Sequence, residues 1–514
     1  MKFLSRLEKN KTFWLLLGIS IIFFLLRLPS LIEPYWYGDE GIYQVIGKSL
    51  ADGRLLYSEI WDNKPPLLYI IYAIFNGDQF SVRLFSLLTG IITVLFFFRL
   101  TILLIKDKNK SIISTVIFTF LFATPILEGN IANAENFMLL PIIIAGIIIF
   151  NTSAKNHKPA ATNRRLVLAG FLLGLAFILK TVAFFDFTAF LLFILLTTSP
   201  QDLHKSRSRL KINKFKFNLN YKLRSQIRII FRGYLAPFIF GFVLPISIIS
   251  LYFLINSNFS EFINAVFLSN FSYVSIENEL FIPHGLLILK LLLLILGVYI
   301  IFLKNKAFSR SQIFILLWFI FSIFNSYFSG RPYAHYTLLL LPSWVLLLGS
   351  LLTKTSKQAR YVFLILIVAS LILVDITFEP NYKKSVNYYE NAISFIFGNK
   401  DIRPYQEFFD KRTPWDYEIA SFIKTHTLTE DQIFIWGDSP QIYSLSNKLP
   451  IGKYTASYHI NQQGNAQVTT NTSLNKIKPK YIIILNGSSP FPFNLPGYSL
   501  KFIINESLIY ERSI

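Results

Sequence analysis

The sequence predicts an α-helical polytopic membrane protein with a small α/β domain at its C-terminus. Of its 514 residues, 53% are hydrophobic and 17% aromatic, above the roughly 45–50% apolar share of soluble domains. Long apolar runs recur from residue 12 to residue 376, and beyond residue 377 the composition becomes that of a soluble domain. We therefore expect a transmembrane domain over 1–376 and an α/β domain over 377–514.

Runs of about 17–25 apolar residues identify candidate membrane spans. Eleven such spans lie near residues 12–30, 82–105, 111–127, 137–151, 166–180, 183–199, 233–256, 284–303, 311–327, 337–352 and 361–376. The first follows several basic residues, as a signal peptide would. Its apolar core is too long for one and no small-residue cleavage site follows, so we interpret it as an uncleaved first helix.

The distribution of charge predicts the orientation. If the N-terminus is cytoplasmic, the segments on the inner side hold more than half of the 50 Lys and Arg residues, against only Glu8, Asp107 and Asp202. This agrees with the positive-inside rule and places the C-terminal domain outside the plasma membrane. The inner segments alone explain the net charge of +21, so nucleic acid is not expected as a partner. The basic segment 203–232 is expected to be a loop beside anionic lipids.

The C-terminal domain shows a pattern of helices and buried strands. We expect an amphipathic helix over Trp415–His426, buried strands within Gln432–Asp438 and Lys480–Ser488, and a β-ribbon over the last fifteen residues. Neither strand is followed by a glycine-rich phosphate-binding loop, so nucleotide binding is not predicted. The chain has no cysteine, which excludes disulfides and thiol nucleophiles.

The first predicted outer loop, residues 31–81, has the most distinctive sequence. A helix after Gly38 would place Ile42, Val45, Ile46 and Leu50 on one face and should lie flat on the membrane surface. Asp39 and Glu40 would then stand at its N-terminus. Such acids can cap the helix and interact with its dipole, and a capped position can also hold a catalytic carboxylate.

A Lys-Pro-Pro sequence follows in the same loop. Pro65 and Pro66 interrupt any preceding helix and can begin a new one, so Lys64 is expected at a rigid elbow beside the bilayer. Its ammonium could extend to bulk lipid phosphates, or it could hold the phosphate of a specific lipid substrate.

These motifs resemble a known family. The order of an apolar span, "GDE", "LADGRLLY", "WDNKPPLLY" and "GDQFSVRLFSLLTGI" is similar to the polyprenyl-phosphate-sugar glycosyltransferases of the GT-C superfamily. That family includes the protein O-mannosyltransferases and the aminoarabinose transferases that modify lipid A. The resemblance continues through "ATPILEGNIANAENFMLLP", "GFLLGLAFILK" and "GRPYAHYTLLLLP", and so covers most of residues 1–376. The C-terminal domain is not part of the shared core.

The resemblance implies an inverting transfer of a monosaccharide from a polyprenyl phosphate on the outer face of the membrane. Asp39 matches the family's catalytic acid and would deprotonate the acceptor hydroxyl, while Glu40 would orient the acceptor or Asp39. Glu135 matches a position that is acidic in the family and would bind acceptor or sugar hydroxyls. Such a reaction needs one general base and cations for the leaving phosphate, without the second, acidic carboxyl of a glycosidase.

Five residues on the predicted outer side are candidates for binding the lipid phosphate: Lys64, Arg83, Lys180, Arg331 and His335. Tyr333 and Tyr336 could stack on a sugar or hydrogen-bond to it. The alternatives are cations that extend to bulk lipid and an interfacial aromatic belt. No cluster with metal-ligand spacing is present in the sequence, so no cofactor is expected beyond the donor lipid. A divalent ion beside Asp39 and Glu40 stays open.

The acceptor implied by this interpretation is an envelope glycan, a glycolipid or a protein. Two other functions are compatible with a polytopic chain. A lipid-linked saccharide transporter or flippase would line a path through the bilayer with its charged groups, whereas here they gather near one face. A non-catalytic anchor that displays the C-terminal domain would not need the acids of the first outer loop.

Overall fold

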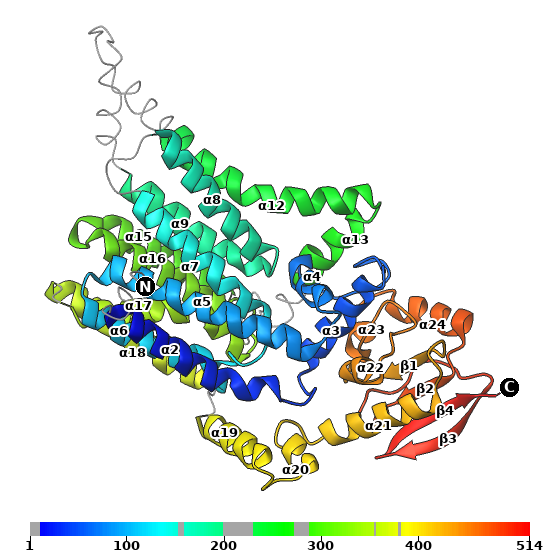
Figure 1. Cartoon of the computed structure of the whole chain (residues 1–514). Helices are drawn as coiled ribbons and strands as arrows, with labels where there is room; N and C mark the ends of the chain where they lie inside the picture. Colours follow the sequence, from blue (N-terminus) through cyan, green and yellow to red (C-terminus); the bar gives the residue numbers. More distant parts are fainter. Residues whose placement is uncertain are drawn as a thin grey trace, which may run out of the picture.

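The computed structural model describes residues 11–152, 159–198, 230–271, 287–353, 356–378 and 382–513. Almost all of the basic segment 203–232, and the basic residues before Lys11, lie outside the described residues. The chain forms a bundle of apolar helices and a smaller sheet-containing unit, which Figure 1 shows at opposite ends of the molecule.

The regular elements of the described chain up to Phe378 are all helices. In order they are α2 (Lys11–Arg27), α3 (Gly38–Ala51), α4 (Pro66–Ile74), α5 (Gln79–Ile105), α6 (Lys108–Ala123), α7 (Ala134–Thr152), α8 (Pro159–Phe177), α9 (Phe184–Thr197), α12 (Ala236–Ile255), α13 (Phe259–Ile263), α15 (Leu287–Leu303), α16 (Arg310–Phe328), α17 (Leu341–Leu351) and α18 (Lys357–Phe378). Short 3-10 turns join several of them, among them η1 (Leu28–Leu31), η2 (Pro125–Leu127), η3 (Thr181–Ala183) and η7 (Ala334–Leu338), and π-helical turns adjoin α12 and α13 as η4 (Phe231–Leu235) and η5 (Asn264–Leu268).

Each of the eleven predicted spans coincides with one apolar helix. Within the described residues, six segments are long and apolar enough to cross a membrane: Lys11–Leu31, Gln79–Ile105, Ala134–Thr152, Phe231–Ile255, Arg310–Phe328 and Lys357–Phe378. Shorter apolar helices include Thr181–Thr197, Leu287–Leu303 and Leu341–Leu351. The chain is therefore a multi-pass membrane protein.

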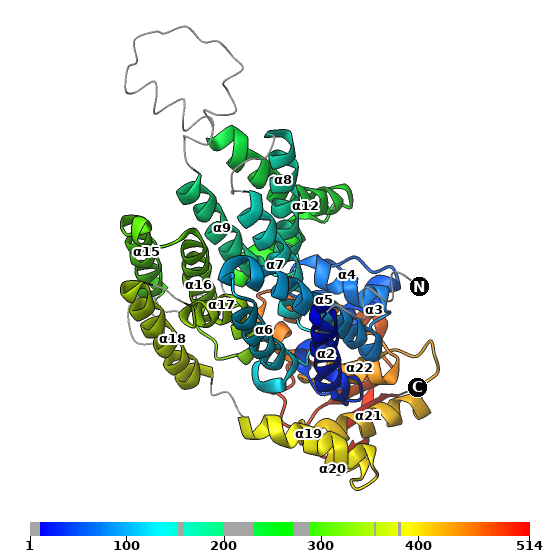
Figure 2. The same ribbon diagram turned by 60° about the vertical axis from the view of Figure 1, so that its left-hand side comes forward.

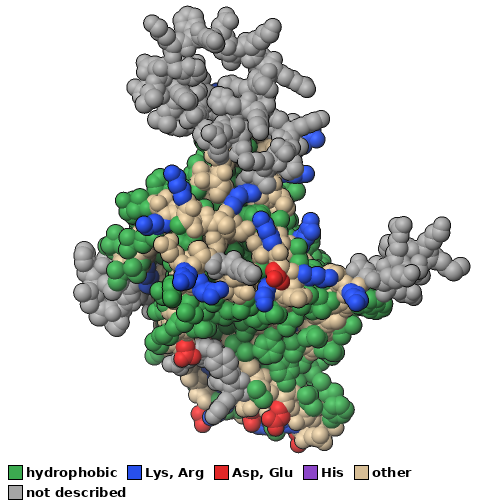
Figure 3. All heavy atoms as spheres, turned by 90° about the vertical axis from the view of Figure 1, so that its left-hand side faces the viewer, with side chains coloured by type: hydrophobic (Ala, Val, Ile, Leu, Met, Phe, Trp, Pro, Cys, Tyr) green, Lys and Arg blue, Asp and Glu red, His purple; other side chains and the backbone are tan. Residues whose placement is uncertain are grey.

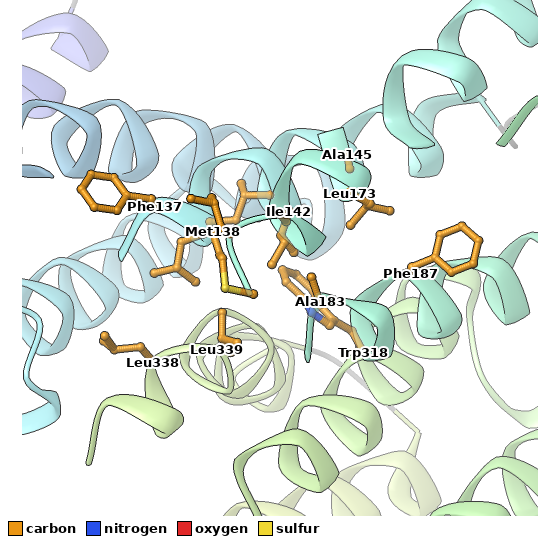
Figure 4. Packing of buried hydrophobic residues seen from close by; sticks show 14 of the residues in the cluster. Phe137, Met138, Ile142, Ala145, Leu173, Ala183, Phe187, Trp318, Leu338 and Leu339 are labelled. Atoms are coloured by element: carbon orange, nitrogen blue, oxygen red, sulfur yellow. The ribbon is translucent and has the colours of Figure 1, made fainter. Parts of the chain in front are cut away.

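The bundle has a continuous apolar core. Figure 4 shows Met138 and Ile142 of α7 facing Leu339 and Trp318, with Leu173 of α8 and Phe187 of α9 to their right in this view. These side chains belong to one cluster of buried hydrophobic residues that extends through the bundle.

Glycines allow α8 and α12 to pack especially closely. A Cβ on Gly170 would lie 2.1 Å from the backbone oxygen of Phe238, and one on Gly241 would lie 2.1 Å from that of Val167. Small residues at helix contacts are a common means of bringing backbones together in membranes, where van der Waals packing drives association.

Basic side chains gather at the end of the bundle away from the sheet unit. Figure 3 views this end and shows Lys and Arg spread over it, above a band of hydrophobic surface. Lys106 lies between α5 and α6, Lys108 and Lys110 lie in the first turn of α6, and the start of α18 carries Lys357 and Arg360. The asymmetry expected from the positive-inside rule is thus present in three dimensions.

The C-terminal unit contains a four-stranded sheet of order β1-β2-β4-β3. Strands β1 (Ile433–Trp436) and β2 (Tyr481–Ile484) are parallel and buried, and β3 (Tyr498–Ile504) and β4 (Ser507–Arg512) form an antiparallel hairpin. The helices are α19 (Tyr382–Ile396), α20 (Ile402–Glu407), α21 (Thr413–His426), α22 (Gln441–Ser446), α23 (Ser457–Gln462) and α24 (Ala466–Ile477). The predicted helix at Trp415–His426, both buried strands and the terminal ribbon are all present.

One buried carboxyl should make the stability of this unit depend on pH. Burial raises the pKa of Asp416 to about 7, although hydrogen bonds from Gln441 and Ser439 favour the ionised form. The folded state then holds a proton that the unfolded chain releases near its ordinary value, so the stabilisation is complete below that value and is lost as pH rises towards 7. Asp416→Asn should therefore be less destabilising at pH 8 than at pH 5, which thermal unfolding at the two pH values will measure.

Helices α3 and α4 lie between the bundle and the sheet unit, as Figures 1 and 2 show. The helix after Gly38 forms as predicted, but the expectation that its polar face meets water is wrong. Gln44, predicted to face water, is buried, and α3 packs on α4 on one side and on α22 on the other. A Cβ on Gly41 would lie 2.8 Å from the backbone nitrogen of Gln441. The face of α3 with Gly41 and Val45 packs against the C-terminal unit, whereas Gln44 donates a hydrogen bond to Gln79 of α5.

Candidate active site

Asp39 and Lys64 form an ion pair at the junction of the bundle and the C-terminal unit. Asp39 lies in the first turn of α3, and its Oδ2 is 3.4 Å from the Lys64 Nζ and accepts a 3.0 Å hydrogen bond from the Tyr43 hydroxyl. The Asp39 side chain is 36% exposed, so this carboxylate is held in place yet remains open on one side.

The surroundings of Asp39 favour its ionised form. Burial alone would raise its pKa, but the charges of Lys64 and His335 and the hydrogen bond from Tyr43 together lower the pKa of Asp39 to about 2. The carboxylate is therefore ionised throughout the physiological range.

The Lys-Pro-Pro elbow is rigid, as expected. Pro65 precedes α4, which begins at Pro66. The backbone of Lys64 is held on both sides, because its nitrogen donates to the Tyr69 hydroxyl and its carbonyl accepts from the Tyr57 hydroxyl at 2.7 Å. The Lys64 ammonium also lies 3.7 Å from Asp62 and 4.8 Å from the centre of the Tyr43 ring. Lys64 thus stands between two carboxylates.

A second ion pair joins the starts and ends of membrane helices. Glu135, in the first turn of α7, pairs with Lys180, which follows α8. The Lys180 ammonium also lies over the Tyr336 ring, 4.3 Å from its centre. Glu135 is buried, so its charge is compensated by Lys180 in the structure as it stands.

His335 lies near both pairs. Its Nδ1 is 2.8 Å from Glu128, which also accepts a 3.0 Å hydrogen bond from the Tyr37 hydroxyl. It is an electrostatic neighbour of both Asp39 and Glu135. Tyr333 is exposed and stacks on the His335 ring, and Arg331 lies partly buried two residues earlier. The structure thus brings Asp39, Lys64, Glu135, Lys180, Tyr336 and His335 together, with Tyr333 at the edge.

The placement of Glu40 and Arg83 argues against the roles expected for them. Both side chains are fully buried, and the Arg83 Nε lies 2.9 Å from one Glu40 oxygen while its Nη1 lies 2.9 Å from Glu33. A carboxylate and a guanidinium enclosed in this way have no face open to an acceptor or a lipid phosphate. Their geometry instead fastens the start of α3 to the start of α5.

Sequence reasoning missed several residues of this group. Asp62 and Glu128 stand inside motifs that carried the family resemblance, so their acidic side chains beside Lys64 and His335 were a usable signal. His459, whose Nε2 lies 3.6 Å from Asp62, comes from α23 in the C-terminal unit. Nothing in its sequence surroundings connects it with residue 62.

The charged groups converge because they stand at helix ends and in the short segments between helices. Asp39, Lys64, Glu135 and Lys180 lie at the starts or ends of helices, His335 lies in the turn η7, and His459 of the C-terminal unit reaches Asp62 beside them. The basic helix ends gather at the end of the bundle away from the sheet unit. A bundle of apolar helices with its ionisable groups at one end and a sheet unit covering that end is the arrangement of a polytopic membrane protein that the GT-C resemblance predicts.

Comparisons with known proteins agree with this class. Residues 64–210 match the model of the dolichyl-phosphate-mannose-protein mannosyltransferase family, which confirms the expected resemblance over this segment. No curated protein shows significant similarity to the chain.

Solved structures share the fold. ArnT from Cupriavidus metallidurans bound to undecaprenyl phosphate aligns over 98% of both chains, with a TM-score of 0.55 and 13% identity. The same protein in the apo state aligns over 97% of this chain and 98% of its own, with a TM-score of 0.51 and 14% identity. An Archaeoglobus fulgidus oligosaccharyltransferase in the apo form aligns over 93% of this chain and 70% of its own, with 12% identity and a TM-score of only 0.47. At these identities the ArnT likeness establishes the fold.

Proposed function

We propose that the chain is a glycosyltransferase that moves a monosaccharide from a polyprenyl-phosphate carrier to a hydroxyl-bearing acceptor, with inversion at the anomeric carbon. The acceptor would be an envelope glycan, a glycolipid or a protein. The reaction would take place at the outer face of the plasma membrane, with the N-terminus in the cytoplasm and the C-terminal unit outside.

The observation that carries this proposal is the juxtaposition of Asp39 and Lys64, 3.4 Å apart, at the end of the bundle opposite the basic helix ends. A base for the acceptor and a cation for the phosphate are the two groups that the chemistry requires. The family matched over residues 64–210 and the ArnT structure with bound undecaprenyl phosphate support a lipid phosphate as the leaving group.

The reaction we propose is a single displacement. Asp39 takes the proton of the acceptor hydroxyl while the acceptor oxygen bonds to the anomeric carbon. The bond from that carbon to the phosphate oxygen breaks, and the phosphate leaves with the electron pair. Lys64 and Lys180 would compensate the charge that develops on it. Attack on the face opposite the leaving group inverts the anomeric configuration.

Lys64 would also control the basicity of Asp39. In the structure, the adjacent ammonium is one of the groups that lower the pKa of Asp39, which makes it a weak base. A donor phosphate that binds Lys64 would share its charge and so raise the pKa of Asp39. The base would then become stronger only when the donor is in place.

Lys64→Met should raise the KM for the lipid donor. A hydrogen bond to a charged group contributes about 1.5–3 kcal/mol, so we expect a rise of roughly 10–100-fold. The measurement is transfer from polyprenyl-phosphate sugars extracted from the native cells, with purified protein in nanodiscs. Lys48→Met, in the same loop but paired with Asn447 of the C-terminal unit, is the control and should keep the wild-type KM. An unchanged KM in Lys64→Met would remove Lys64 from the phosphate site.

A further inference from the structure

Asp62 is a buried carboxylate that the proposed reaction does not use directly. It is 2% exposed, and its oxygens accept hydrogen bonds from the Tyr69 hydroxyl at 2.6 Å and from the Asn63 backbone nitrogen at 2.8 Å. The Lys64 ammonium lies 3.7 Å away. Because a buried charge is costly unless it is compensated, the partners of Asp62 decide how strongly it attracts Lys64.

One of those partners comes from the C-terminal unit. The Nε2 of His459, in α23, lies 3.6 Å from the Asp62 Oδ1, and its side chain is 5% exposed. The imidazole packs edge to face on Trp61, with ring centres 5.0 Å apart, and also contacts Tyr458. Aromatic packing on two sides fixes the orientation of the ring relative to the carboxylate.

The protonation of His459 follows from its surroundings. Burial lowers its pKa below the ordinary value, although Asp62 acts in the opposite direction, so the ring is neutral at pH 7. Within the described chain, its Nδ1 has no hydrogen-bond partner. We therefore place the single proton on Nε2, where it points to Asp62.

Two other contacts between the first outer loop and the C-terminal unit are of a different kind. Trp61 donates its backbone N–H to the carbonyl of Lys453 at 2.8 Å, and Arg54 donates to the carbonyl of Pro450 at 2.8 Å. These contacts hold the two parts together without touching an ionisable group of the site. The His459 contact is directed at a carboxylate that in turn faces Lys64.

We propose that His459 is a positioning residue of the transferase site: through Asp62 it sets the place of the Lys64 ammonium and so the affinity for the donor phosphate. This inference rests on the proposed function. The N–H dipole of His459, 3.6 Å from the carboxylate, offsets part of the charge of Asp62. Without it, Asp62 attracts Lys64 more strongly and draws the ammonium away from Asp39 and from the phosphate. The C-terminal unit would then be a working part of the site.

The test is the affinity of the purified full-length protein for undecaprenyl phosphate in nanodiscs. His459→Ala should weaken binding about fivefold, less than the loss of a hydrogen bond to a charged group would cause, because the 3.6 Å contact is longer than a hydrogen bond. His459→Gln keeps a side-chain N–H donor and should stay within about twofold of the wild type, whereas general damage to packing would weaken both variants alike. His426→Gln changes an exposed histidine of the same unit that packs on Phe422 and should have no effect.

The outcomes separate this inference from the proposed function. If the wild type binds no undecaprenyl phosphate, the phosphate site itself is wrong and the inference fails with it. If the wild type binds the lipid and Lys64→Met weakens binding, but His459→Ala binds as tightly as the wild type, only the role of His459 is overturned. Equal losses in the Ala and Gln variants, together with lower melting temperatures, would also overturn it, because they would indicate a purely structural role.

Discussion

Replacing Asp39 with Asn should lower the rate of sugar transfer by about 10³-fold, within the range that a positioned general base contributes. The amide keeps the size of the carboxylate and can still accept from Tyr43, which donates to Asp39 at 3.0 Å. It cannot take a proton from the acceptor. The measurement is the initial rate of transfer from extracted polyprenyl-phosphate sugars at saturating donor.

The matched control for this change is Asp52→Asn. Asp52 is exposed just after α3 in the same loop, so the variant should transfer sugar at the wild-type rate. The Asp39→Asn variant should bind undecaprenyl phosphate at least as tightly as the wild type, because Lys64 loses a competing anion. A variant that transfers sugar at the wild-type rate would show that Asp39 is not the base.

The second large effect is expected from Arg83. Replacing it with Met should lower the free energy of unfolding by about 3–5 kcal/mol, as when one member of a buried ion pair is removed. The change would leave Glu33 and Glu40 buried without their cation. Glu33 also accepts hydrogen bonds from Tyr388 at 2.6 Å and from Asn130 at 2.9 Å. The loss of stability would therefore extend to α19 and to the loop before α7. Denaturant unfolding in detergent will measure it.

A surface ion pair provides the contrast for Arg83. Arg403 pairs with Glu407 and Glu418, and all three side chains are exposed. Arg403→Met should change the free energy of unfolding by less than about 1 kcal/mol, because water already solvates these charges. A small effect of Arg83→Met would mean that the buried network is dispensable, and Arg83 would again be available to bind a lipid phosphate.

The elements of the fold could be predicted from the sequence because their signals are local. Hydropathy alone placed all eleven apolar helices, since a membrane-spanning segment must be apolar along its whole length. The strands at Ile433–Trp436 and Tyr481–Ile484 were visible as short runs of β-branched and aromatic residues between turns. The two prolines after Lys64 fixed the start of α4 in the same way.

The surroundings of α3 could not be predicted, because they depend on residues distant in the sequence. Its apolar and polar faces predicted a polar face in contact with water, and the C-terminal unit that packs against α3 begins more than three hundred residues later. Gly41 is buried against Gln441, a contact that no local pattern reveals. A polar face indicates that a helix is not lipid-exposed there, but it does not distinguish water from protein.

The candidate site was only partly visible for the same reason. The family resemblance singled out Asp39 and Glu135, and residue type with the predicted side of the membrane singled out Lys64, Lys180 and His335. These five residues do lie together. Those criteria cannot tell a cation that faces an open space from one enclosed by acids, and so they grouped Arg83 with Lys64. The distinction depends on Glu33 and Glu40, and on burial that only the packed structure shows.

The most direct test follows the fate of the lipid carrier itself. Purified protein in proteoliposomes would receive labelled polyprenyl-phosphate sugars from the native cells together with a membrane extract containing the acceptor. We predict that free polyprenyl phosphate appears with the label transferred to the acceptor, and that both depend on Asp39. Movement of the intact lipid-linked sugar across the bilayer without release of the phosphate, unchanged in Asp39→Asn, would contradict the account.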